Sequence, residues 1–143
     1  MQPDLHPFDE LPCAAYAIPA LYDLSYGSET SGHEAALAAH EAARHAFEAG
    51  MSAGDNHQYG EAARLYFECA VHYRLVADSD PQITMITKNA QLCYDSAMYA
   101  YAEAGRFAAE GRAALEQAAL DDPRLAPSLH KMLANAPTDC PVR

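Results

Sequence analysis

Two glutamate–histidine pairs have a spacing that could bind a metal ion. Glu41 precedes His45 and Glu68 precedes His72, each by four residues, so each pair shares one face of a helix. If the two helices are antiparallel neighbours, the four side chains could converge as they do in carboxylate-bridged bundles. Those bundles use Glu-x-x-His, which is one residue shorter. The pattern therefore favours a surface charge pair on the first helix and a half-buried histidine on the second, with a metal-binding or sensory bundle as the alternative.

Other catalytic patterns are missing from the sequence. "HEAARH" at 40–45 places Arg44 where a zinc protease needs its second histidine. "GMSAGD" lacks the lysine and the preceding strand of a phosphate-binding loop, and no spacing supports a Ser-His-Asp arrangement. We therefore expect a protein that is not an enzyme and that needs no cofactor.

The four cysteines, Cys13, Cys69, Cys93 and Cys140, form no CxxC pair. The chain opens without the basic start and apolar run of a secretory signal, so we expect a cytoplasmic protein with free thiols. Cys69 and Cys93 lie at similar distances from "DSDP" and are expected to face each other as small buried hydrophobic groups. Cys13 and Cys140 adjoin prolines, and could pair only under oxidising conditions.

Charge narrows the choice of partner. The formal net charge is −11, and residues 1–43 contain seven acidic residues but no lysine or arginine. An acidic surface repels phosphate backbones, so we expect neither nucleic acid nor an anionic membrane as a partner. No apolar stretch approaches the length of a membrane span. The composition suits a soluble protein, or one with a basic partner.

The 143 residues are the usual size of one domain. We expect an irregular amino-terminal arm over 1–30, a helical domain over 31–135 and a tail over 136–143. The apolar, aromatic part of the arm, "CAAYAIPALYDLSYG", is expected to cover the helical body, with the filling of a groove as the alternative.

Apolar residues at helical spacing predict an all-α fold, because no strand pattern competes. The first helix starts at the capping box of Ser31 and Glu34 and is expected to end near Met51, where glycines follow. The other helices are expected at about 57–77, at 81–104, directly after Gly105, and at 124–134. Short loops make sequence neighbours antiparallel.

Two aspartates and two glycines are expected to shape the ends and the packing of the helices. Asp80 and Asp122 each precede a proline and are expected to cap the next helix. Gly105 is expected to form a tight turn, and Gly111 to allow close packing on the helix that follows.

Two segments share a further pattern, in which a glycine and an aromatic residue form a turn and a helix of small residues then runs to Asp-Pro. This pattern resembles the tetratricopeptide repeat, in particular the longer variety of kinesin light chains. The matching residues are Tyr59, Ala62, Tyr66, Cys69 or Ala70, and Pro81 in the first unit, and Gly105, Phe107 and Pro123 in the second. Glu110 stands where the family has an alanine. The resemblance implies antiparallel hairpins stacked as a short array of four to five helices; an up-down helical bundle is the alternative.

The resemblance also implies a groove lined by the first helix of each pair. Its lining would include Arg44, Phe47, Met51, Lys88, Asp95 and Tyr99. We therefore expect an adaptor, chaperone or other interaction module that binds a peptide or a partner helix. Two units are fewer than such arrays usually need, so a homodimer is one way to complete the stack.

Overall fold

The computed structural model describes residues 18–24, 33–80, 82–136 and 138–140. These residues form helices and loops and contain no strand, which confirms the all-α prediction. The α-helices are α2 (His33–Asp55), α3 (Tyr59–Val76), α4 (Ile83–Glu103), α5 (Arg112–Asp121) and α6 (Ala126–Ala134). A 3-10 turn, η1 (Ala77–Ser79), follows α3, and a π-helical turn, η2 (Phe107–Gly111), precedes α5.

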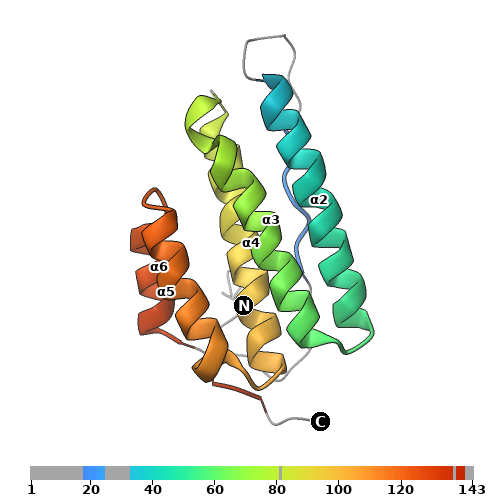
Figure 1. Cartoon of the computed structure of the whole chain (residues 1–143), viewed down its shortest axis with the longest axis vertical. Helices are drawn as coiled ribbons and strands as arrows, with labels where there is room; N and C mark the ends of the chain where they lie inside the picture. The colour runs from blue at the N-terminus through green and yellow to red at the C-terminus, as the bar shows by residue number, and fades with distance from the viewer. Residues whose placement is uncertain (1–17, 25–32, 81, 137, 141–143) are drawn as a thin grey trace, which may run out of the picture.

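Successive helices are antiparallel and pack against one another (Figure 1). Helix α3 lies between α2 and α4, α6 packs on α5, and η2 connects α4 to α5. Among the described residues, no helix has both the length and the apolar character that crossing a bilayer requires. The arrangement fits either a short array of hairpins or a bundle, so the resemblance to tetratricopeptide repeats stays a prediction.

Small residues let these helices approach closely. Ala63, Ala70, Ala90 and Ala97 are completely buried along α3 and α4. A β-carbon at Gly50 of α2 would lie 2.8 Å from the ring of Tyr66 in α3. The core therefore depends on backbone proximity, with the large rings filling the space that remains.

The predicted end of the first helix is wrong. Helix α2 continues past Met51 and Gly54 to Asp55. Gly50 is needed for packing against Tyr66, so it does not end the helix. The turn comes instead at His57, whose φ of 61° places it in the left-handed region.

The tight turn predicted at Gly105 is confirmed, with a φ of 71°. Phe107 directly after it is buried. A β-carbon on Gly111 would lie 2.6 Å from Cδ1 of Phe107, which confirms the predicted close packing. The carboxylate of Asp139 in the tail accepts hydrogen bonds from the backbone N–H groups of Phe107 (2.6 Å) and Ala108 (3.1 Å).

The two predicted aspartate caps have different outcomes. Asp80 accepts a hydrogen bond of 2.7 Å from the backbone N–H of Gln82 at the start of α4. Asp122 does not cap α6, because its carboxylate is buried against Arg124 at 3.1 Å and the Tyr94 hydroxyl at 3.3 Å. Helix α6 begins only after Leu125. Ser31 and Pro81 lie outside the described residues.

Candidate functional site

Residues 18–24 lie along the helical body between α2 and α4 (the blue segment in Figure 1). Tyr22 contacts Asn89 of α4, and Asp23 contacts His40 of α2. Ile18 lines a pocket with Met51 near the end of α2 and Tyr99 of α4, so the segment runs antiparallel to both helices. We call the space between α2 and α4 the groove and residues 18–24 the arm segment.

Asn89 holds the backbone of the arm segment at one residue. Its Oδ1 accepts a hydrogen bond of 2.7 Å from the N–H of Tyr22, and its Nδ2 donates one of 2.8 Å to the carbonyl of the same residue. The amide is completely buried, and Nδ2 also donates to the Tyr73 hydroxyl at 3.2 Å. The side chain thus satisfies both backbone groups of an extended residue within the protein.

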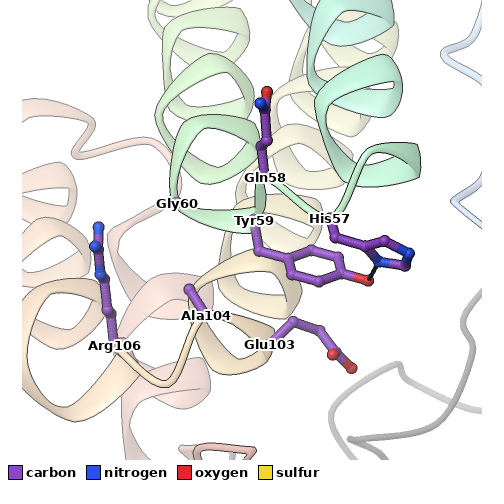
Figure 2. Close-up of a pocket in the computed structure, with 7 residues that line it drawn as sticks. All are labelled: His57, Gln58, Tyr59, Gly60, Glu103, Ala104 and Arg106. Carbon is purple, nitrogen blue, oxygen red and sulfur yellow. Dashed lines mark hydrogen bonds between the residues drawn. The ribbon is translucent and has the colours of Figure 1, made fainter. Parts of the chain in front are cut away.

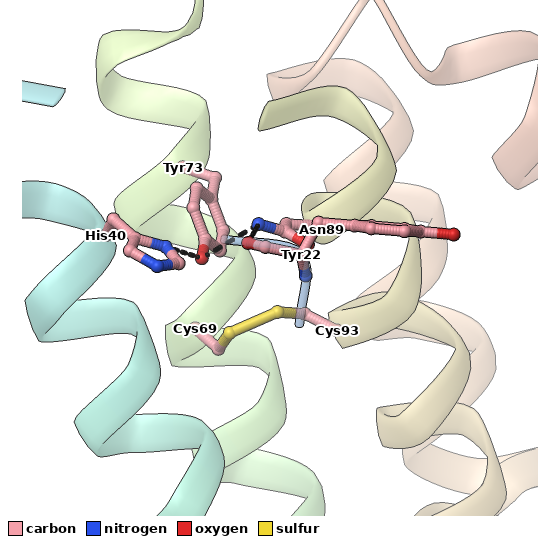
Figure 3. Close-up of a disulfide and its surroundings, with 6 residues drawn as sticks. All are labelled: Tyr22, His40, Cys69, Tyr73, Asn89 and Cys93. Carbon is pink, nitrogen blue, oxygen red and sulfur yellow. Dashed lines mark hydrogen bonds between the residues drawn. A yellow bond between two sulfur atoms is a disulfide. The ribbon is translucent and has the colours of Figure 1, made fainter. Parts of the chain in front are cut away.

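Tyr73 connects Asn89 to His40 (Figure 3). Its hydroxyl lies 2.5 Å from Nδ1 of His40. Burial raises the pKa of Tyr73, so the hydroxyl keeps its proton and can donate it to Nδ1 while accepting from Asn89. The ring proton of neutral His40 is then on Nε2, which faces Asp23 at 3.7 Å.

Apolar side chains complete the contact between the arm segment and the helices. Leu24 is buried, while Ile18 and Leu21 are partly buried against the core. Beyond Ile18 the groove widens into a pocket of about 280 Å³ that Met51 and Tyr99 help to line. The groove therefore offers a fixed polar contact at Tyr22 with apolar contacts on either side of it.

Four of the six predicted groove residues lie at this site. Met51 and Tyr99 line the pocket. Lys88 places its Nζ 5.5 Å from the centre of the Tyr22 ring, and Arg44 lies one turn beyond His40 on α2.

The other two predicted groove residues have different positions. Phe47 is buried with its ring centre 5.2 Å from that of Tyr66, so it belongs to the core. Asp95 is half-buried on the face of α4 that also carries Lys88 and Tyr99, and it accepts a hydrogen bond of 3.1 Å from Gln91 on the same helix. Helical spacing alone did not distinguish core from groove at Phe47.

Sequence reasoning missed the residue that contacts the arm segment most directly. Asn89 lies on the buried face of α4 between Ile86 and Cys93, where an asparagine is unfavourable for the helix and costly to bury. A polar residue within an apolar line was the available signal. His40 carried the same signal in the apolar stripe of the first helix.

The predicted metal pairs do not come together in the part of the chain that the structure describes. His45 pairs with Glu41 at 3.6 Å on the exposed face of α2. Glu68 is exposed and His72 is half-buried on α3. No group of three or more potential ligands among the described residues could hold a metal ion, so the convergence that this alternative needs is not seen there.

A second pocket of about 510 Å³ lies where the α2–α3 turn meets the α4–η2 turn (Figure 2). His57 and Tyr59 share a hydrogen bond of 3.1 Å on one side of it. Glu103 and Arg106 extend in different directions, so the polar side chains of this pocket do not converge on one point.

The free thiols expected at Cys69 and Cys93 are wrong. The two residues face each other as predicted, but a disulfide joins them between α3 and α4, with their Cα atoms 6.0 Å apart (Figure 3). Cys140 is disulfide-bonded as well, and Cys13 lies outside the described residues. The free thiols were inferred from the expected cytoplasmic location, where disulfides are rare, so the disulfide counts against that expectation.

Comparison with known proteins gives no match to a family model, to a curated protein or to a solved structure. Any assignment of function therefore depends on the groove itself.

Proposed function

We propose that this protein is a non-enzymatic interaction module that binds an extended segment of a partner protein in the groove between α2 and α4. The observation that carries the proposal is the pair of hydrogen bonds between Asn89 and the backbone of Tyr22. An amide that donates to and accepts from one residue recognises an extended chain whatever its side chain is. An adaptor or a chaperone needs recognition of this kind.

The arm segment supports the proposal because it occupies the groove as a ligand would. It makes backbone hydrogen bonds at one residue and places Leu24 in a buried position. Since it is tethered to the helical body, its effective concentration is high, on the order of millimolar. A partner segment must therefore displace it, and displacement should be the step that limits the observed affinity.

The test compares the intact protein with a full-length variant whose arm segment is released. The substitutions Leu21→Gln and Leu24→Gln place amides where the arm segment is apolar, which costs about 1–3 kcal/mol at buried Leu24 and less at half-buried Leu21. The probe is a fluorescent peptide with the sequence of residues 17–26, AIPALYDLSY. The matched control carries Pro19→Gln and Ala20→Gln, since both positions are exposed.

Fluorescence anisotropy should show saturable binding to the released variant, at least about tenfold tighter than to the control or the unmodified protein. Adding Asn89→Ala to the released variant should abolish that binding. A released variant that keeps its helical circular dichroism and binds no peptide would refute the proposed function. If the variant unfolds, Leu24→Ala alone provides the milder release.

A further inference from the structure

Two cations stand beside the arm segment in a protein that is otherwise acidic. The formal net charge is −11, and the chain has only nine lysines and arginines. Two of these, Arg44 and Lys88, stand beside the arm segment together with His40. The arm segment itself is acidic at Asp23. Arg44 and Lys88 therefore give local positive charge beside Tyr22 and Asp23, although Glu41 pairs with Arg44, Asp55 lines the adjoining pocket and the whole molecule is acidic.

Asp23 is the charged contact on the α2 side. Its Oδ1 lies 3.7 Å from Nε2 of His40, and its side chain is 85% exposed while that of His40 is only 9% exposed. The histidine is thus fixed in place by Tyr73 and presents one nitrogen to the groove. A carboxylate from another chain could reach the same nitrogen from solvent.

Arg44 adds a full positive charge near the same carboxylate. Its guanidinium bonds Glu41 at 2.5 Å. The hydrogen bond and charge of Glu41, with smaller contributions from Glu48 and Asp23, raise the pKa of Arg44. The Arg44 side chain is about half exposed, so a second carboxylate can reach the guanidinium from solvent beside Glu41. The α2 wall therefore favours a carboxylate next to the residue that Asn89 holds.

On the α4 side, Lys88 favours an aromatic side chain at the position of Tyr22. Its Nζ lies 5.5 Å from the centre of the Tyr22 ring, which is within the range of a cation–π contact. The residue held by Asn89 is therefore best filled by an aromatic side chain. Leu24, two positions after Tyr22, is buried, so that position favours an apolar side chain of leucine size.

We infer that the partner segment is acidic as well as hydrophobic: an extended stretch with an aromatic residue at the Asn89 contact, a carboxylate directly after it, and a leucine-sized residue next. This inference rests on the proposed function of the groove and names the chemistry of the partner. It replaces the basic partner that the net charge alone suggested.

The test uses the full-length released variant, Leu21→Gln with Leu24→Gln, and four versions of the peptide of residues 17–26. These are the unmodified peptide, Asp23→Asn, Asp23→Lys and Leu24→Ser. Asp23→Asn should weaken binding roughly threefold to fivefold at 50 mM NaCl, because one partly exposed ion pair is lost. Asp23→Lys should weaken it more, and both differences should shrink at 500 mM NaCl because salt screens the groove.

Variants of the protein identify the cation that binds the Asp23 carboxylate of the peptide. Arg44→Gln should reduce the preference for Asp23 over Asn at that position. Arg64→Gln is the matched control, since Arg64 is an exposed arginine of α3 that pairs with Glu61 in the same i, i+3 relation. The control should keep the preference of the released variant.

The outcomes separate this inference from the proposed function. Equal binding of the Asp, Asn and Lys peptides, with weaker binding of Leu24→Ser, would overturn the acidic preference and leave the groove as a binding site. No binding of any peptide would overturn the proposed function itself. The intact chain gives a second readout: Asp23→Lys should speed chymotrypsin cleavage after Tyr22, and Glu34→Lys at an exposed site of α2 should not.

Discussion

At the scale of single residues, Asn89 links the arm segment to the core. Its amide makes two hydrogen bonds to Tyr22 and one to Tyr73, all from a completely buried position. Removing it leaves the backbone groups of Tyr22 and the Tyr73 hydroxyl without these partners. A buried polar group that loses its partner destabilises the fold by more than one hydrogen bond normally contributes, because no water replaces the lost partner.

Asn89→Ala should therefore lower the free energy of unfolding by about 3 kcal/mol. The measurement is urea denaturation followed by circular dichroism. Asn56→Ala is the control, since exposed Asn56 donates a single hydrogen bond of 3.1 Å to the Ser52 carbonyl. That change should cost less than about 0.5 kcal/mol. Equal losses in the two variants would show that Asn89 does not hold the arm segment.

His40 should make stability depend on pH. Burial lowers the pKa of His40 despite the opposing effect of Asp23, and Arg44 lowers it further while Glu41 raises it. The Tyr73 hydroxyl contacts Nδ1 of His40, while Asp23 faces Nε2. Because the unfolded chain binds the proton more tightly, the contribution of His40 is fully present above its unfolded pKa of about 6.5. It is lost as the pH falls from there towards the lowered folded value.

Urea denaturation between pH 8 and pH 5 measures this dependence. The unmodified protein should lose stability below about pH 6.5. His40→Gln should be less stable at pH 8 and should lose less on acidification. His45→Gln, on the exposed face of the same helix, is the control and should follow the unmodified protein. A His40→Gln variant with an unchanged acid dependence would contradict this account.

At the scale of helices, the sequence predicted where they form better than where they end. The break at Gly105 was predictable because the turn needs a left-handed residue there, and glycine meets that need locally. The continuation of α2 through Gly50 and Gly54 was not, since Gly50 serves the packing on Tyr66, a contact that depends on α3. Asp122 failed as a cap for the same reason: Arg124 and Tyr94 bind its carboxylate.

In the candidate site too, some residues were predictable from the sequence, while others depend on contacts between distant segments. The resemblance to a helical repeat, which stays a prediction, led us to expect Arg44, Met51, Lys88 and Tyr99 in one groove, and these four lie beside the arm segment. Phe47 faces the core instead. The arm segment as the occupant of the groove could not be chosen from sequence over a simple cover, because its position depends on Asn89.

Two glycines should respond in opposite directions to substitution by alanine. Gly111→Ala places a β-carbon 2.6 Å from Phe107 and 3.1 Å from Tyr101, so the Phe107 ring must turn and η2 must shift away from α4, at a cost of about 1–3 kcal/mol. Gly54→Ala meets nothing within 4 Å and lies in a helix, so it should add about 0.5–1 kcal/mol. Thermal and urea unfolding measure both. A neutral Gly111→Ala would mean that η2 is not held this close to α4.

At the scale of the whole molecule, the Cys69–Cys93 disulfide joins the two central helices beside the arm contacts. It closes a loop between residues that are 24 positions apart. Closing a loop of that length stabilises a folded chain by about 3 kcal/mol, because it restricts the unfolded state. The disulfide therefore connects the stability of the helices, and with it the shape of the groove, to the redox state of the surroundings.

Reduction should lower the free energy of unfolding by more in the unmodified protein than in Cys69→Ala with Cys93→Ala. The double variant is required because Cys140 is also disulfide-bonded. Dithiothreitol therefore reduces the Cys140 disulfide in the unmodified protein and in the variant alike. The difference between the two losses isolates the Cys69–Cys93 bond and should be about 3 kcal/mol. Urea denaturation with and without dithiothreitol gives the four values. Equal losses in the two chains would show that this bond does not stabilise the fold, and groove binding should then be insensitive to reduction at Cys69 and Cys93.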